Sequence, residues 1–139
     1  MARHPLSLVR LTPPAGWHDA SVLSFVAPEV NGFRANVLVT HEMVTDTDVN
    51  VFADRQSAEL AGALAQYRKL SREKIKVGAI DAVSVAYTFA SPNGSVVRQQ
   101  VVYALLGEIA YTLVMTSDEA AAESSARAFA QVLAEFQIG

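Results

Sequence analysis

Cysteine is absent from this 139-residue sequence, and its absence removes several kinds of site at once. Without thiols there is no disulfide framework, no thiolate zinc site, no cysteine nucleophile and no cysteine for an N-terminal lipid anchor. The three histidines, His4, His18 and His41, stand far apart and match no metal-ligand spacing. We therefore expect neither a metal ion nor an organic cofactor.

Other signatures are missing as well. The sequence has no phosphate-binding loop, no dinucleotide-binding glycine pattern and no nucleophile elbow of a hydrolase. It has no Lys/Arg run, and its formal charge of −3 argues against a nucleic-acid partner. No stretch approaches the roughly 18 apolar residues of a membrane span, and the N-terminus lacks the apolar centre of a signal peptide. We expect a non-catalytic protein of the cytoplasm that does not insert into membranes.

What the sequence does contain predicts one α+β domain over residues 1–139, since this length suits a single core. Apolar alternation and turn residues predict strands, and helical stripes predict two main helices. The lone Trp17 is predicted to anchor the core beside a turn. We expect an antiparallel, curved sheet of about six to seven strands. The predicted strands are 6–11, 21–27, 33–41, a charged edge strand from about 71, 80–90, 95–106 and 109–115, and the helices are 51–70 and about 116–136.

The hairpin Ile80–Leu106 is the most strongly defined part of this pattern. Its turn, Ser91-Pro92-Asn93-Gly94, favours a three-residue loop with Gly in the left-handed conformation, which would pair Ser91 with Ser95. Odd-numbered positions then form a face of large apolar residues with Gln99 among them. Even-numbered positions form a face of small residues with a few hydrogen-bonding groups. Neither face is clearly polar, so both are expected to contact something.

The two predicted helices provide candidates to cover these faces. Asp48 or Asn50 is predicted to cap the first helix, and the pattern Thr116-Ser117-Asp118-Glu119 predicts a capping box for the second. The second helix carries an apolar stripe that we expect to pack on the large odd face. For the small even face two interpretations remain open. Either the first helix covers it, or part of it stays exposed as a groove for an apolar segment of a partner.

Three short motifs, in their order and spacing, carry a family resemblance. They are Pro14-x-x-Trp17-x-Asp19, Phe52-Ala53-Asp54 at the start of the first helix, and Arg98-Gln99-Gln100-Val101 in the hairpin. With the order of elements, they make residues 6–136 resemble the DcrB-like family, whose fold is of the PsbP type. Within it, the chain looks most similar to the EagR chaperones of type VI secretion in Gram-negative bacteria.

The resemblance implies a specific activity and site. EagR chaperones are homodimers that bind the hydrophobic N-terminal (pre-PAAR) transmembrane helices of PAAR-domain effectors before secretion. The resemblance also implies a cargo groove. At one position of this groove the family commonly carries Gln, and this sequence has Glu59 there. By this resemblance the groove residues are Val22, Ser24, Leu38, Glu59, Ala63, Tyr67, Ala86, Val96, Arg98, Gln100 and Val102.

Two alternatives belong to other classes of function. A PsbP-like binding module would recognise a folded protein through a polar, charged patch. An immunity protein would neutralise a toxin encoded beside it. Exposure of the even face separates the chaperone from the binding module.

Overall fold

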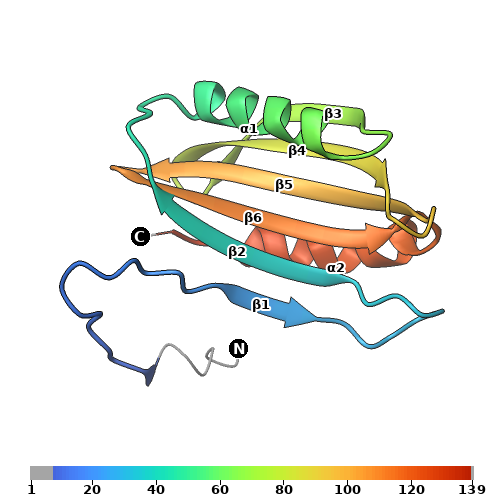
Figure 1. Cartoon of the computed structure of the whole chain (residues 1–139), viewed down its shortest axis with the longest axis horizontal. Helices are drawn as coiled ribbons and strands as arrows, with labels where there is room; N and C mark the ends of the chain where they lie inside the picture. Colours follow the sequence, from blue (N-terminus) through green and yellow to red (C-terminus); the bar gives the residue numbers. More distant parts are fainter. Residues whose placement is uncertain (1–7, 139) are drawn as a thin grey trace.

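The computed structural model describes residues 8–138, which form a six-stranded antiparallel sheet with one helix on each face (Figure 1). The strand order is β1-β2-β6-β5-β4-β3, and Figure 1 shows the sheet strongly curved. This confirms the predicted α+β class. The elements are β1 (Leu23–Val26), β2 (Asn36–Met43), α1 (Val49–Ala63), β3 (Arg68–Val77), β4 (Ile80–Ala90), β5 (Val96–Leu106), β6 (Ile109–Asp118), a 3₁₀-helix (Glu119–Ala121) and α2 (Ala122–Glu135).

The β4–β5 hairpin has the predicted turn and register. Ser91 N donates to Ser95 O at 2.8 Å, Gly94 N donates to Ser91 O at 2.9 Å, and Gly94 has φ +86°. Ala90 lies opposite Val96, so the odd and even residues of both strands separate onto opposite faces as expected. The charged strand β3 lies at the edge of the sheet, also as predicted.

Helix α1 packs on the odd face, which we call the α1 face. Phe52 is fully buried there and meets Tyr103 edge to face, with ring centroids 5.7 Å apart. The interpretation in which this helix covers the even face is therefore wrong. The other core residues on this side are Ala53, Val83, Val85, Tyr87, Val101 and Ala110.

Helix α2 packs on the even face, which we call the α2 face. The prediction that its stripe lies on the large odd face is also wrong. Phe129 and Leu133 of α2 pack against the buried cluster of this face, which includes Ala82 and Ala104. The physical reason is complementary volume: bulky helix residues fill the space above small sheet residues, while the alanine-rich α1 fits the face that carries tyrosines.

Two helix boundaries differ from the prediction. Helix α1 ends at Ala63 rather than near residue 70, because Gln66 turns the chain at φ +54° and β3 begins pairing at Arg68. Thr116 is not a helix cap, because β6 continues through it to Asp118. The Asp118 side chain instead accepts a hydrogen bond from Ala121 N at 2.9 Å. Asp48 caps α1 as predicted, through Asn50 N at 2.8 Å.

The segment before β1 departs most from the prediction. Residues 8–11 do not form a strand, and the rest of the predicted strand, residues 6–7, lies outside the described residues. Trp17 is not a core anchor, since 74% of its surface is exposed. The core does not need this segment, because α1 already covers one face of the central strands and α2 covers the other.

Candidate functional site

The eleven predicted groove residues lie on opposite faces of the sheet. Directly paired residues share a face, and the row Val85, Val101, Val114, Leu38 and Ser24 runs across the α1 face. The adjacent row, which contains Ala86 and Gln100, runs across the α2 face. A single groove in one copy of the chain cannot use both sets.

The α2-face set consists of Ala86, Val96, Arg98, Gln100 and Val102. Val102 is fully buried in the core beneath α2, whereas Val96 is 46% exposed near the hairpin turn. Covered by α2, Val102 is not accessible to a guest, whereas Val96 remains accessible. The burial of Val102 follows from the packing of α2, which the sequence pattern assigned to the other face.

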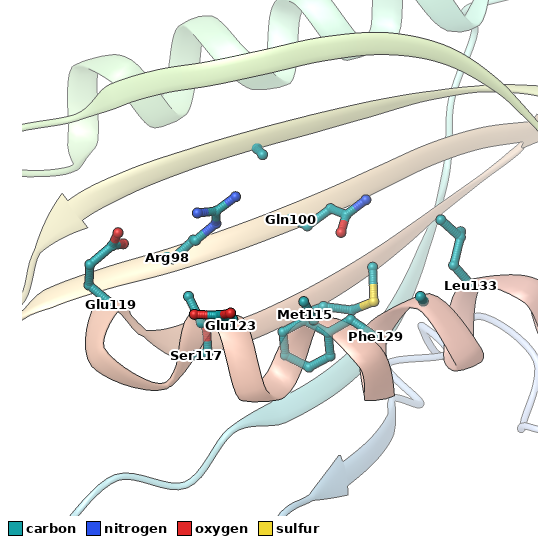
Figure 2. A pocket seen from close by; sticks show the side chains of 12 residues that line it. Arg98, Gln100, Met115, Ser117, Glu119, Glu123, Phe129 and Leu133 are labelled. Carbon is teal, nitrogen blue, oxygen red and sulfur yellow. The ribbon is translucent and has the colours of Figure 1, made fainter.

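The remaining three residues of this set line a cavity of about 530 Å³ between β5 and α2, which we call the α2 groove. In Figure 2, Arg98 and Gln100 project from β5 on one side, and Glu119 and Glu123 stand on the other. Gln100 Nε2 donates to Ser84 Oγ at 3.0 Å. The groove is short and carries charges of both signs, which suits a polar guest better than a long apolar one.

The α1-face set begins with Ser24 and Leu38, on a part of the sheet that α1 does not cover. Helix α1 packs on β4 and β5, and Figure 1 shows it away from β6, β2 and β1. We call the uncovered part the open strip. Val22 immediately precedes β1 and is exposed. The open strip comprises Ser24 and Val26 of β1, Asn36, Leu38 and Thr40 of β2, and Thr112 and Val114 of β6, with the buried Thr116 at its end.

Glu59 and Ala63 lie on the flank of α1 that borders the open strip. The opposite flank faces β3, because Arg72 reaches Asp54 Oδ1 at 3.2 Å and Asn50 Oδ1 at 3.3 Å. At about 3.6 residues per turn, Glu59 and Ala63 are roughly half a turn around the helix from Asp54. The sheet order then places them toward β6.

A tyrosine cluster lies on the same face of the sheet. Tyr67 precedes the far edge strand β3 and Tyr87 is on β4, so β4 and β5 separate Tyr67 from the open strip, while Tyr103 on β5 is nearer to it. The rings of Tyr67 and Tyr87 are 5.1 Å apart, and Tyr103 lies close enough to be influenced by both Tyr67 and Glu59. Burial raises the pKa of the Tyr87 and Tyr103 hydroxyls well above their usual range, and the other tyrosines and, for Tyr103, the Glu59 carboxylate add to this effect. These hydroxyls therefore stay neutral at all physiological pH values.

A hydrogen-bonded row links this cluster to the strip. The Tyr87 hydroxyl donates to Gln99 Oε1, and Gln99 Nε2 donates to Thr116 Oγ1 at 3.0 Å. These bonds fix the orientation of the Gln99 amide at the edge of the open strip. Gln99 was absent from the predicted groove, although its place among large apolar residues on the odd face was a signal. Val26, Val114 and the strip threonines were missed because the strand order β1-β2-β6 is not visible in the sequence.

Taken together, the open strip offers apolar contact and hydroxyl groups, and the α1 flank borders it with Glu59 and Ala63. Small side chains allow another backbone to approach closely, and the hydroxyls can bond to polar groups on it. Within residues 8–138, no three His, Asp or Glu side chains gather in a way that could hold a metal ion.

Comparisons with solved structures support the fold. The protein of unknown function PA94 from Pseudomonas aeruginosa is similar with a TM-score of 0.83 at 18% identity, over 93% of this chain and 90% of that one. LpqN, involved in cell envelope biogenesis of Mycobacterium tuberculosis, has a TM-score of 0.56 at 12% identity, over 86% and 85%. The cyanobacterial PsbP of Synechocystis has a TM-score of 0.56 at 11% identity, over 93% and 99%.

These three likenesses establish a PsbP-like fold and nothing about activity. Among curated proteins, none matches the sequence. A family profile described as DcrB, however, matches residues 9–135, nearly the whole chain. The chain therefore belongs to the DcrB family.

Proposed function

We propose that this protein is a non-catalytic, cytoplasmic chaperone that binds the hydrophobic N-terminal helices of a PAAR-domain effector of type VI secretion. The proposal combines membership of the DcrB family with the resemblance of three sequence motifs to the EagR chaperones. The observation that carries it is the open strip, whose width and composition suit one apolar helix. The α1-face residues of the predicted groove, among them Leu38, Glu59 and Ala63, are assigned to this site.

The width of the strip matches the diameter of a helix. Three strands at about 4.8 Å spacing make it about 14 Å wide, and a helix with its side chains is about 10–12 Å across. The strip itself covers residues 36–40 of β2 and 112–116 of β6, which corresponds to about 17 Å along the strands. A helix that spans the apolar core of a bilayer is about 30 Å long. One strip can therefore contact about half the length of such a helix.

The chemistry of the strip suits such a guest. Leu38, Val114 and Val26 supply apolar contact, and Thr40 and Thr112 supply hydroxyls next to them. A contact of roughly 400 Å² would contribute on the order of 10 kcal/mol before the cost of ordering the guest. Glu59 at the border has its carboxylate exposed to water, so a guest that covers it must offer a polar group in return.

A second copy of the chain is part of the proposal. A membrane-spanning helix is apolar on all sides, and one strip covers only one side of it. Two copies with facing strips would enclose the guest, which gives a physical reason for the homodimer that the resemblance implies. The chaperone itself has no helix in residues 8–138 that is long and apolar enough to cross a membrane.

The experiment is co-expression of the chain with the apolar N-terminal segment of a PAAR effector, followed by size-exclusion chromatography with light scattering. The expected result is a soluble complex of two copies of the chain with the segment. A segment that stays insoluble while the chain elutes alone would refute the chaperone function. A scrambled segment of equal hydropathy serves as the control for nonspecific capture.

A binding module for a folded protein is the second candidate, and two observations favour it: α2 covers much of the even face, and the α2 groove is polar. Arg98 faces Glu119 and Glu123 across a cavity of about 530 Å³, which is the polar, charged patch that this alternative requires. In that case Arg98→Ala would abolish partner binding, and substitutions on the open strip would leave it unchanged. The chaperone predicts the reverse.

A further inference from the structure

Exposed apolar side chains are concentrated at one end of the chain. Thirteen large apolar residues are exposed within residues 8–138, and eight of them lie between residues 8 and 30. Four of the eight, Leu8, Val9, Leu11 and Trp17, belong to the segment before β1. The other four, Val22, Phe25, Val26 and Val30, border or belong to β1. The remaining five are scattered over β2, α1, β3 and β5, so they form no comparable patch.

Residues 8–22, which we call the arm, are all exposed and contain a local turn. Trp17 N donates to Pro14 O at 3.1 Å, and Gly16 at φ +82° completes this turn. Asp19 accepts from Ser21 N at 2.9 Å. Pro13 and Pro14 restrict the backbone further, which lowers the entropy that the arm loses when it is bound. The arm is thus preorganised to present its apolar side chains.

The base of the arm is tied to its own sheet. Ser21 Oγ lies 3.2 Å from His41 Nε2 on β2, and Asp19 Oδ1 lies 3.8 Å from the same nitrogen. Beyond this anchor the arm projects away, and Leu11 and Trp17 are 87% and 74% exposed. Exposed apolar side chains that lie close together commonly mark a site of protein interaction.

A receiving surface lies next to the arm, at the same edge of the sheet. On the α2 face, β1, β2 and the end of α2 enclose an apolar cleft of about 540 Å³, with Val37, Val132 and Phe136 among its walls. A second cavity of about 360 Å³ shares Val37 and Val132 with it and extends it along α2. β1 is an edge strand with a neighbour on one side only, and such strands readily meet another chain.

The area and charge of this region fit self-association. Six of the eight side chains, without Val22 and Val26 on the α1 face, expose roughly 500 Å² of apolar surface, if a Val or Leu contributes about 60–120 Å² when fully exposed and an aromatic residue about 150–250 Å². The walls of the cleft add to this area. A stable protein interface buries about 800 Å² on each partner. Residues 8–30 contain only Arg10, Asp19 and Glu29 as charged residues besides His18, so two copies do not repel one another strongly.

We propose that the arm of one copy packs on β1 and on the apolar cleft beside α2 of a second copy, and that this exchange builds the dimer. The inference depends on the dimer of the proposed function but not on its cargo. It identifies where the two copies are joined. It also leaves both open strips uncovered, because the cleft lies on the α2 face.

The test uses the full chain without cargo and exploits Trp17 as the sole tryptophan. Molar mass by light scattering, tryptophan emission and acrylamide quenching are measured over a concentration series. As the dimer forms, we expect emission to move to shorter wavelength and quenching to fall, because Trp17 becomes buried. Leu11→Asp is expected to weaken the dimer at least tenfold and to keep Trp17 quenchable. Leu70→Asp, the same change on edge strand β3, is expected to leave the dimer unchanged.

Three results would overturn the proposal. They are a wild-type chain that stays monomeric, a dimer in which Trp17 remains fully quenchable, and a Leu11→Asp variant that dimerises as tightly as the wild type. Leu38→Asp separates this proposal from the chaperone function. That variant is expected to dimerise normally while it loses cargo binding. A loss of cargo binding alone would therefore not contradict the proposed arm interface.

Discussion

Leu38 offers the sharpest test of the proposed cargo site, because it lies at the centre of the open strip. It pairs with Ser24 on one side and Val114 on the other, and it is half-buried in the chain without cargo. Leu38→Asp removes apolar contact with the guest and places a carboxylate under it. Val96→Asp places the same charge on the opposite face, at a residue that is 46% exposed.

The magnitude follows from what the guest would cover. Burying the exposed half of a leucine side chain contributes about 1 kcal/mol. Covering an unpaired carboxylate costs at least about 2 kcal/mol more. The sum of about 3 kcal/mol corresponds to an affinity loss of roughly 100-fold. The fold should survive, because Asp in a half-exposed strand position costs on the order of 1 kcal/mol.

The assay measures binding of the effector segment, fused to a soluble carrier, to immobilised wild-type and variant chains. Circular dichroism and urea unfolding establish that each variant is folded. Leu38→Asp should lose binding and Val96→Asp should keep it. If Val96→Asp loses binding instead, the cargo lies on the α2 face. If both variants bind like the wild type, the open strip is not the cargo site.

Three further predictions concern the fold. Phe52→Ala should lower the free energy of unfolding in urea by about 3–5 kcal/mol, because it empties a fully buried site against Tyr103. Val51→Ala, at the exposed neighbouring residue, should change this free energy by less than about 0.5 kcal/mol. Equal effects of the two substitutions would contradict the assigned core. Gly94→Ala should cost about 1–2 kcal/mol through its φ of +86° alone, since an added Cβ meets no atom within 4 Å; an unchanged urea midpoint would show that the turn is different. The raised pKa of Tyr103 means that its neutral hydroxyl favours the folded state fully below the ordinary value of 10.0, and this contribution is lost as pH rises above that value. Tyr103→Phe should therefore move the alkaline unfolding midpoint, followed by circular dichroism, to higher pH, and a midpoint that does not move would contradict the burial of this hydroxyl.

Several parts of the fold could be predicted from the sequence because they depend on neighbouring residues. The turn at Asn93-Gly94 needs only local backbone preferences, and it sets which hairpin residues share a face. The Asp48 cap is equally local. The lysines of β3 predicted an edge strand because unpaired edges favour charge. In each case the decisive interactions lie within a few residues or one hairpin.

The assignment of helices to faces could not be predicted in this way. Periodicity shows that Phe129 and Leu133 share a helix face, but not which sheet face they meet. That choice depends on the volumes of side chains from distant strands and on the path of the chain across the sheet. The position of Trp17 could not be predicted for the same reason. A large apolar residue is expected in the core, and only the folded structure shows that Trp17 is exposed.

The site depended on the tertiary structure even more strongly. The sequence determined the residue types, the hairpin and the family motifs. Only the strand order β1-β2-β6-β5-β4-β3 brought Leu38 beside Val114 and placed Gln100 on the other side of the sheet. Neighbouring residues of a strand lie on opposite faces of the sheet. Gln99 pairs with Thr116 and borders the open strip, whereas Gln100 lies on the α2 face. Pairing between strands far apart in the sequence sets that register, and for this reason only the folded chain shows it.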